Sequence, residues 1–600
     1  MDEAARQRAQ LNRERALAIR REREQEEREA PWGERGWADC VDPRRVTFHG
    51  DASVGRGVLE GGGTLARPPS TCVVLWVSAA QRCEWNHALE LALWAANRVR
   101  LPLLALFVLT DAYPEANLRH YTFMLEGMPE LRLGLEARGV ALAVMHASAA
   151  GGGVPGAVAA VCRSLRAELV VTDRAYLRVP RAWREEVATR LGEGQGNEGR
   201  KIIPVVEVET DAVVPVDVAS KVREHSAAAF RPKVTAKVAE FLKPVARVEL
   251  ATDLRRTELP SALISTVTDP RLVRELSSDV LNWSVEEGVG RKIHRRGADE
   301  EAAVQSVLAR LEVDRSVKAC SWAFPGGRRA ALARLDTFLR TMLPRYAESR
   351  NDPSAALQSH QAPYLQYGMV SPLELVLAVR ARCAQGVAGS AERDTLRAGG
   401  DVYFEELVVR RELSLNHCWH ARDTYDTWDV LPGWARATLE AHEDDEREAV
   451  YDEGTLEGAR TGDPVWNAAQ RQMMRTGKMH NYLRMYWAKR VIEWTQAGPR
   501  EALQVVLRLN NKWSLDGRGP SSFTGVLWCF GLHDREFPER RILGGVRTLT
   551  SAGMQRKFGA LSIRGYVDRH DDATPHVDAK ARQPSLFELF GKRRRLSERE

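Results

Sequence analysis

The chain has 600 residues, of which 44% are hydrophobic and 28% are charged, and it carries a net charge of +6 at pH 7. This length exceeds what one hydrophobic core usually serves, so we expect two or three domains of an ordinary globular protein. No apolar run reaches the roughly 18 residues that a membrane-spanning helix needs, and we expect no membrane association. The mild positive charge is compatible with a polyanionic partner and equally with solvated surface.

Motif searches exclude several common classes of enzyme and site. The 8 cysteines are scattered without a CxxC pair, which predicts free thiols in a reducing compartment. His417 and His420 have the spacing of metal ligands, but no second cluster accompanies them, so we expect no metal site. The absence of HExxH, Walker A and GxSxG motifs removes the common hydrolase interpretations.

The first 70 residues read as a charged and glycine-rich N-terminal tail. Residues 1–30 are dense in Arg and Glu and contain no aromatic residue, which is typical of a solvated helix or a disordered segment. The stretch GRGVLEGGG then precedes the first strong strand signal and reads as a linker. The many acidic residues argue against an organelle transit peptide.

Residues 71–210 alternate apolar strands with helical periods. The strand candidates are TCVVLWVS, LPLLALFVL, VALAVMHA, ELVVTD and IIPVVEV. This pattern predicts an α/β domain with a doubly wound, Rossmann-like parallel sheet. The turn after the first strand reads SAAQR rather than GxGxxG, so we do not expect NAD to bind there by the Rossmann mechanism.

The rest of the chain divides into three further parts. Residues 211–335 mix proline, glycine and charged runs, and we predict an interdomain linker. Helical periods dominate residues 336–570, which predicts an all-α C-terminal domain. Residues 571–600 form a basic tail, in which Gln583 to Phe590 resembles a sliding-clamp peptide and residues 592–595 resemble a nuclear localisation patch. A solvated tail is an equal alternative for both, so clamp binding and nuclear localisation are open predictions.

Tryptophans concentrate in the predicted helical domain, where half of the chain's 16 lie between Trp419 and Trp528. On a helix, Arg484, Trp487 and Trp494 share one face. Spacing alone favours core aromatics on an amphipathic helix, although stacked indoles beside a buried cation also suit redox chemistry.

A series of ordered motifs decides between these alternatives. Residues 346–558 contain YAESRNDP, QAPYLQYGMVS, EELVVRREL, DPVWNAAQ, GKMHNYLRMYWAKRVIEW and LNNKWSLDGR. This region resembles the flavin domain of class II cyclobutane pyrimidine dimer photolyases, and a weaker match through SAAQRCEWNHAL and NLRHYTFML extends upstream to about Leu75. The resemblance implies a monomeric DNA repair lyase that binds FAD, active in its reduced form, and splits a flipped-out dimer in UV-damaged DNA by light-driven electron transfer. A cryptochrome-like light sensor without repair activity is the alternative.

The resemblance also implies which residues bind the flavin. They are Tyr346, Asn351, Ser359, Gln361, Leu365, Arg484, Asn510, Asp516, Gly517 and Asp534. Arg484 is expected to pair with Asp534 beside the ring, Asn510 to lie at the flavin N5 atom, and Asp516 to lie near the polar edge of the ring. The α/β domain is a candidate site for an antenna chromophore, whose identity the sequence does not reveal.

Electron transfer and substrate binding are assigned in the same way. The expected electron path runs through Trp487, nearest the flavin, and Trp466, with Trp494 as a third member. Glu406 is expected to hydrogen-bond the dimer, and Met485 and Trp528 to form apolar walls. Arg547 is expected to enter the space that the lesion vacates. Arg410, Arg556 and Lys557 complete the expected DNA-binding residues.

Several positions depart from the family pattern. Ala362 replaces a serine expected to face the flavin phosphate, Gln366 and Tyr367 replace histidine and phenylalanine, and Asp217 replaces a tryptophan. Leu415, His417, Gly519 and Ser521 also differ from the usual residues. Each departure is expected to weaken binding by about 1 kcal/mol per lost hydrogen bond.

Overall fold

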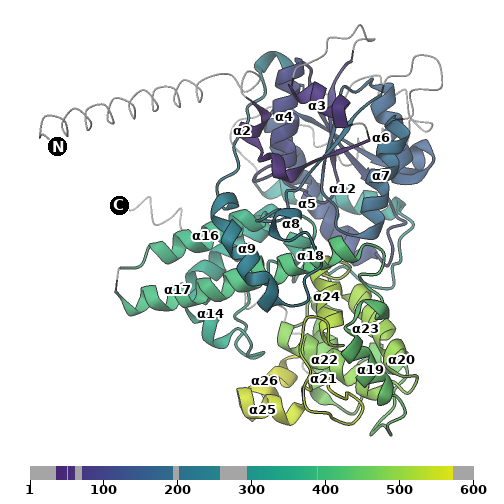
Figure 1. Ribbon diagram of the computed structural model, residues 1–600, viewed down its shortest axis with the longest axis vertical. Helices are drawn as coiled ribbons and strands as arrows, with labels where there is room; N and C mark the ends of the chain where they lie inside the picture. The colour runs from purple at the N-terminus through teal and green to yellow at the C-terminus, as the bar shows by residue number, and fades with distance from the viewer. Residues whose placement is uncertain are drawn as a thin grey trace, which may run out of the picture.

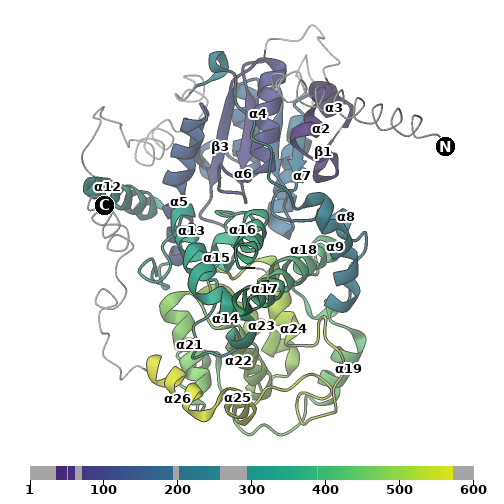
Figure 2. The same cartoon turned by 90° about the vertical axis from the view of Figure 1, so that its left-hand side faces the viewer.

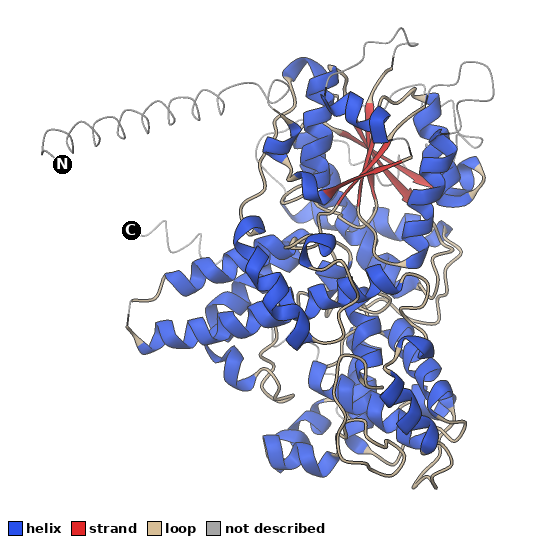
Figure 3. Ribbon diagram, viewed as in Figure 1, coloured by secondary structure: helices blue, strands red, loops and turns tan. Residues whose placement is uncertain are grey.

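The protein folds into an α/β lobe and a helical lobe that share an extended interface (Figure 1). The computed structural model describes residues 36–50, 52–60, 70–192, 202–256, 293–387 and 389–571. Within these residues, all strands lie in the α/β lobe (Figure 3). The N-terminal 35 residues and the predicted clamp and nuclear-localisation segments lie outside the described residues.

Five of the six strands of the sheet are parallel to one another. They are β2 (Val73–Val77), β3 (Leu103–Leu109), β4 (Ala141–His146), β5 (Val170–Asp173) and β6 (Val205–Val208). The strand order is β1-β6-β5-β2-β3-β4, where β1 (Val46–His49) is the antiparallel edge strand. The topology therefore reverses between β2 and β5, as in a doubly wound sheet.

Helices cover both faces of this sheet, and the side-chain alternation of the strands shows how. In β2, Val73, Leu75 and Val77 pack with α4 (His87–Val99) and α5 (Leu118–Ala137). The alternate residues Val74 and Trp76 pack with α6 (Gly153–Ser164) and α7 (Arg178–Gly192). Burial of both faces explains why the strands read as continuous apolar runs, and the predicted fold class is confirmed.

The prediction of a tail over residues 1–70 is wrong for its second half. Residues 46–49 form strand β1 (Val46–His49), which pairs antiparallel with β6, and α3 (Ala52–Glu60) follows it. Helix α2 (Trp37–Cys40) precedes them. A four-residue strand with the sequence VTFH carries too little periodicity to be recognised, and its physical role is to cover the edge of β6.

Much of the predicted linker is also folded. It contains α8 (Val216–Ala219), α9 (Ala227–Phe241), η3 (Thr252–Leu254), α12 (Ile293–Arg310) and α13 (Arg328–Thr337). Phe230, Val234 and Val238 of α9 lie in one core with residues of the helical lobe, including Phe338 and Leu373. The 211–335 segment is thus in large part a structural element of the interface between the lobes.

The helical lobe contains the elements that carry the predicted site. Its helices are η4 (Phe338–Met342), α14 (Leu343–Ser349), α15 (Ala362–Gln366), α16 (Pro372–Ala384), α17 (Ala391–Phe404), η5 (Glu405–Arg410), α18 (Arg411–Ala421), η6 (Trp428–Val430), α19 (Gly433–Ala441), α20 (Glu453–Glu457), α21 (Pro464–Thr476), α22 (Asn481–Trp494), α23 (Pro499–Trp513), α24 (Pro520–Trp528), α25 (Ser551–Phe558) and α26 (Ala560–Arg569). Helices α21 to α24 pack together below the interface (Figure 2). Among the described residues, no helix has both the length and the apolar character to cross a membrane.

Candidate functional site

A largely buried cluster of charged side chains connects the start of α22 to the turn after α23. The Asp516 carboxylate accepts a hydrogen bond of 2.9 Å from Arg484 and a second from Lys478, and Ser514 Oγ donates to it at 2.9 Å. Burial alone would raise the pKa of Asp516, but the two neighbouring cations hold this pKa well below its usual range. Two cations facing one carboxylate leave a net positive charge, which suits an anionic ligand.

One predicted pairing is wrong. Arg484 pairs with Asp516, whereas Asp534 accepts two hydrogen bonds from Arg547, at 2.8 and 3.0 Å. Asp534 therefore belongs with the residues predicted to bind DNA. The resemblance implied the pairing with Asp534, and the packing of the loop after α24 instead brings Asp534 to Arg547.

Asn510, predicted to face the flavin N5 atom, has a defined amide orientation. Its Nδ2 donates to Ser522 Oγ at 2.7 Å and faces Asn511 Oδ1 at 3.4 Å. Asn511 Oδ1 is itself an acceptor, because it receives the Arg518 backbone N–H at 3.0 Å. Asn510 Oδ1 is left buried without a partner. The side chain therefore presents a free acceptor.

The other residues predicted to bind the cofactor lie on α14, on α15 and in the loop between them. Tyr346 is buried with its ring 5.2 Å from that of Phe338, and Ser359 hydrogen-bonds the Tyr403 hydroxyl. Gln361 donates to the Ala331 carbonyl at 2.9 Å, which leaves its buried Oε1 unpaired. Asn351 lies in the turn after α14. Leu365 instead lines the cavity between the lobes described below.

These residues fit the flavin implied by the resemblance. Arg484 Nε, Asn510 Oδ1 and Gln361 Oε1 are buried without partners in the described structure, and such atoms are costly unless a ligand satisfies them. At Gly517, a side chain would come within 2.9 Å of the Asn510 and Ser514 carbonyl oxygens. The donors, the free acceptor and the net positive charge match a polar heterocycle with anionic groups.

Three buried indoles form a continuous contact path behind α22. The Trp466 ring stacks on Trp487 with a centroid distance of 6.0 Å and an interplanar angle of 12°. Trp466 also meets Trp494 edge to face at 5.5 Å. Trp466, on α21, therefore bridges two tryptophans that lie seven residues apart on α22. Their order is Trp487, Trp466, Trp494, with Tyr451 5.1 Å beyond Trp494.

An aromatic and basic surface lies on the other side of α22. The Arg547 guanidinium lies 5.4 Å from the Trp528 ring centre and 4.4 Å from that of Phe537. Beneath Trp528, the buried Lys489 ammonium lies 5.9 Å from the indole and donates to the Cys529 carbonyl. Met485 is half-buried beside this group. Exposed Lys557 extends the surface over the Tyr482 ring at 4.7 Å, with Arg556 next to it.

Glu406 lies in η5, where its carboxylate forms a 2.9 Å ion pair with Arg350. Arg410, from the same element, pairs with Glu405 at 3.0 Å. Sequence reasoning missed Arg350, Lys478, Lys489 and Asn511. All four lie within the motifs quoted above, but their presence in a motif did not indicate what each residue contacts.

Several departures from the family pattern have defined contacts. The end of the Gln366 side chain occupies the space beside Gly519, where a Cβ atom would come within 1.8 Å of Gln366 Oε1. Asp217 accepts from Arg174 at 3.1 Å and from the Trp419 indole at 2.9 Å. His417 and His420 each hydrogen-bond a backbone carbonyl, and no group of three metal-binding side chains occurs among the described residues.

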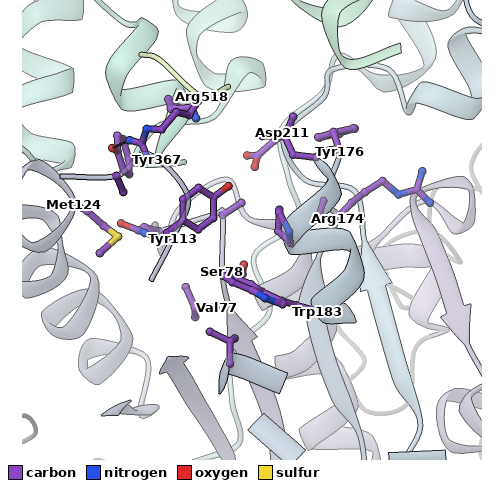
Figure 4. Close-up of a pocket in the computed structure, with 18 of the residues that line it drawn as sticks. Val77, Ser78, Tyr113, Met124, Arg174, Tyr176, Trp183, Asp211, Tyr367 and Arg518 are labelled. Carbon is purple, nitrogen blue, oxygen red and sulfur yellow. Dashed lines mark hydrogen bonds between the residues drawn. The ribbon is translucent and has the colours of Figure 1, made fainter. Parts of the chain in front are cut away.

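A cavity of about 220 Å³ lies between the lobes at the carboxyl ends of β2, β3 and β5. This is the point where the sheet topology reverses, which is the usual ligand position in doubly wound sheets. In Figure 4, Tyr113, Trp183 and Ser78 line it from the α/β lobe, and Tyr367 and Arg518 line it from the helical lobe. The Tyr113 and Trp183 rings are 5.9 Å apart and nearly perpendicular.

Comparisons with known proteins identify the family of the chain. A family described as DNA photolyase matches residues 73–249. The deoxyribodipyrimidine photo-lyase of Methanothermobacter thermautotrophicus is 38% identical, over 83% of this chain and 94% of its own length. That of Arabidopsis thaliana is 32% identical, over 82% and 88%.

Two solved structures share the fold. A bacterial class III photolyase from Agrobacterium tumefaciens superimposes with a TM-score of 0.53 at 16% identity, over 85% of this chain and 88% of its own. A cryptochrome from Synechocystis sp. PCC6803 gives a TM-score of 0.56 at 16% identity, over 83% and 89%.

Proposed function

Because the chain belongs to the DNA photolyase family, we propose that it is a class II enzyme that uses light to split cyclobutane pyrimidine dimers in DNA. The observation that carries this proposal is the arrangement around α22. A buried acceptor and a net positive cluster lie at one end of the helix, a tryptophan path lies behind it, and an aromatic and basic surface lies in front. Each part has a distinct role in light-driven repair.

The cofactor is proposed to be FAD, held by Arg484, Lys478, Asn510 and the residues around Gln361. When bound in its reduced form, FAD supplies the photoexcited electron that opens the cyclobutane ring. The net positive charge of the Arg484, Lys478 and Asp516 cluster favours an anionic ring over a neutral one. Asn510 Oδ1 accepts an N–H, which suits the protonated N5 atom of the reduced flavin better than the bare N5 of the oxidised form.

The substrate is proposed to be a dimer flipped out of the duplex, which costs less to extrude than an intact pair. Trp528 and Met485 provide apolar walls for it, and Arg547 fills the vacated space. Glu406 is an acceptor because Arg350 pairs with its carboxylate. Its suitable partner is therefore the imide N–H of a dimer base.

The interdomain cavity is proposed to hold an antenna chromophore. Aromatic side chains on one wall and Arg174, Ser78 and Asp211 at its polar positions suit a planar aromatic molecule with hydrogen-bonding groups. Energy passes from such a site without any contact between the two ligands. The protein is proposed to act as a monomer.

The test is an absorption spectrum of purified protein followed by repair of a dimer-containing oligonucleotide under near-ultraviolet or blue light. Flavin absorbance and dimer loss in the light, but not in the dark, are the expected results. Flavin binding and lesion-independent photochemistry without dimer loss would instead indicate a light sensor.

A further inference from the structure

The start of α5 in the α/β lobe caps the end of α23 in the helical lobe. Asn117 Nδ2 donates to the Lys512 carbonyl at 2.8 Å, and Arg119 donates to the Trp513 carbonyl at 2.7 Å. His120 Nε2 donates to the Ser514 carbonyl at 3.1 Å. Carbonyls at a helix end have no partner within their own helix, so one lobe completes the last turn of the other. This contact uses the NLRH segment, which the proposed function leaves without a role.

A residue next to this contact reaches the site itself. Glu115, just before α5, accepts a 2.7 Å hydrogen bond from Asn511 Nδ2. Its φ of +56° places it in the left-handed region, which non-glycine residues adopt only when their surroundings require it. Glu115 therefore adopts an uncommon backbone conformation, and in this conformation its carboxylate contacts Asn511 of α23.

One acceptor and one donor, the Glu115 carboxylate and the Arg518 backbone N–H, determine which way the neighbouring amides face. The Glu115 Oε2 atom accepts from Asn511, which therefore turns its Nδ2 toward Glu115. Asn511 Oδ1 then faces the Arg518 N–H and Asn510 Nδ2. This leaves Asn510 Oδ1 as the free, buried acceptor of the site.

We propose that Glu115 is a positioning residue that acts through Asn511 to hold the Asn510 carbonyl oxygen toward the flavin. This inference rests on the proposed function, because it requires flavin beside Asn510. The protonated N5 of reduced flavin donates a hydrogen bond and the N5 of oxidised flavin accepts one. Holding the Asn510 oxygen toward this atom thus stabilises the reduced form, and a reversed amide would stabilise the oxidised form.

The experiment measures the flavin midpoint potential of the wild-type holoenzyme and of four variants by spectroelectrochemistry without DNA. In Glu115→Ala, the Asn511 and Asn510 amides lose one fixed acceptor and the potential is expected to fall. At a fixed applied potential, the ratio of reduced to oxidised flavin should drop on the order of tenfold, as for the loss of about one hydrogen bond. Glu115→Gln retains an acceptor oxygen and should restore most of the wild-type ratio.

Asn117→Ala is the matched control, because it removes a contact from the same interface but does not touch the Asn511 amide. It should leave the potential unchanged. Asn511→Leu, which removes the intermediate amide, should reproduce the effect of Glu115→Ala. An unchanged potential in Glu115→Ala, or an equal shift in Asn117→Ala, would overturn the proposal. Since no dimer is present, this result is independent of whether the protein repairs DNA.

Discussion

Arg547 is a partly exposed cation of the surface proposed to bind the lesion. Its guanidinium donates hydrogen bonds of 2.8 and 3.0 Å to Asp534 and lies beside the Trp528 and Phe537 rings. A long cationic side chain held in this way loses little further freedom when DNA binds. Its orientation, rather than its charge alone, is then its contribution to recognition.

Arg547→Ala is expected to weaken binding to dimer-containing DNA about tenfold and binding to intact duplex much less. The reason is that the space it fills exists only when a dimer is flipped out. Asp534→Asn should show a milder version of the same preference, because it loosens the guanidinium. Arg541→Ala, at an exposed ion pair with Glu446, is the control. Fluorescence anisotropy with both duplexes provides the measurement, and equal losses would reduce Arg547 to a phosphate contact.

Lys489 gives the same region a distinctive pH dependence. Burial lowers the pKa of Lys489 to about 8 from its ordinary 10.5, so between these values the unfolded chain binds more protons than the folded protein. The stability of the wild type should therefore rise with pH across this window, by up to about 3 kcal/mol from this group. Lys489→Met should lack this contribution. Urea unfolding of both holoenzymes at pH 7.5 to 10 tests it, and parallel profiles would contradict it.

At the level of elements, α21 and α22 act as one unit because their indoles interlock. Trp466 donates its Nε1–H to the Trp487 carbonyl, and Trp487 donates to Gln470 Oε1. The acceptors, a backbone carbonyl and a glutamine amide oxygen, are both neutral. Each hydrogen bond fixes the direction of one indole N–H group. The packing that holds the two helices together thus also builds the contact path from Trp487 to Trp494.

Trp487→Phe is expected to block photoreduction of oxidised flavin but to leave repair by chemically prereduced enzyme intact. Trp466→Phe should show the same separation, since it removes the bridge between Trp487 and Trp494. Trp94→Phe, which alters an equally buried indole of α4, controls for lost packing. Photoreduction rates and repair yields of the flavin-loaded variants are compared. Loss of repair by prereduced Trp487→Phe would place this residue on the substrate side.

Sequence patterns predicted the elements with strong hydrophobic signals. They missed elements whose conformation depends on packing against other parts of the fold. The strands from β2 to β6 were predictable because burial on both faces leaves continuous apolar runs. Strand β1 was not, because a short edge strand has no such run. Helix α9 carries apolar residues at Phe230, Val234, Val238 and Phe241, a usable signal that its charged positions obscured.

The candidate site shows the same limit. The resemblance identified Arg484, Asn510, Asp516 and the three tryptophans, which the structure gathers around α22. It placed Asp534 with the wrong partner, because which carboxylate meets an arginine depends on loop packing and not on spacing. The cross-lobe contact of Glu115 with Asn511 could not be predicted, since the two residues are 396 positions apart.

At the scale of the whole molecule, polar contacts between the two lobes position the site. Arg82 of the α/β lobe, for example, donates to the Gly368 carbonyl of the helical lobe at 2.9 Å. Glu412 of α18 accepts backbone N–H groups from Val213 and Val214, next to the sheet. Buried polar contacts of this kind fix the lobes relative to one another and shape the cavity between them.

The DNA affinity of the protein is expected to fall steeply with salt. Each phosphate contact releases counterions and contributes a slope of about −0.9 in log K against log salt for a duplex. Arg556→Ala and Lys557→Ala should each reduce the slope by about one unit and affect damaged and intact DNA alike. Affinity measured from low to moderate salt tests this, and an unchanged slope in both variants would remove α25 from the interface.

The most direct test of the repair function is the quantum yield of dimer repair by prereduced protein, measured for the wild type and for Glu406→Ala at equal flavin content. Light-dependent loss of dimers by the wild type is expected. The variant should have a lower yield per absorbed photon, because the carboxylate contact to the dimer is gone. Normal flavin content and lesion binding without light-dependent dimer loss by the wild type would contradict the proposed repair function.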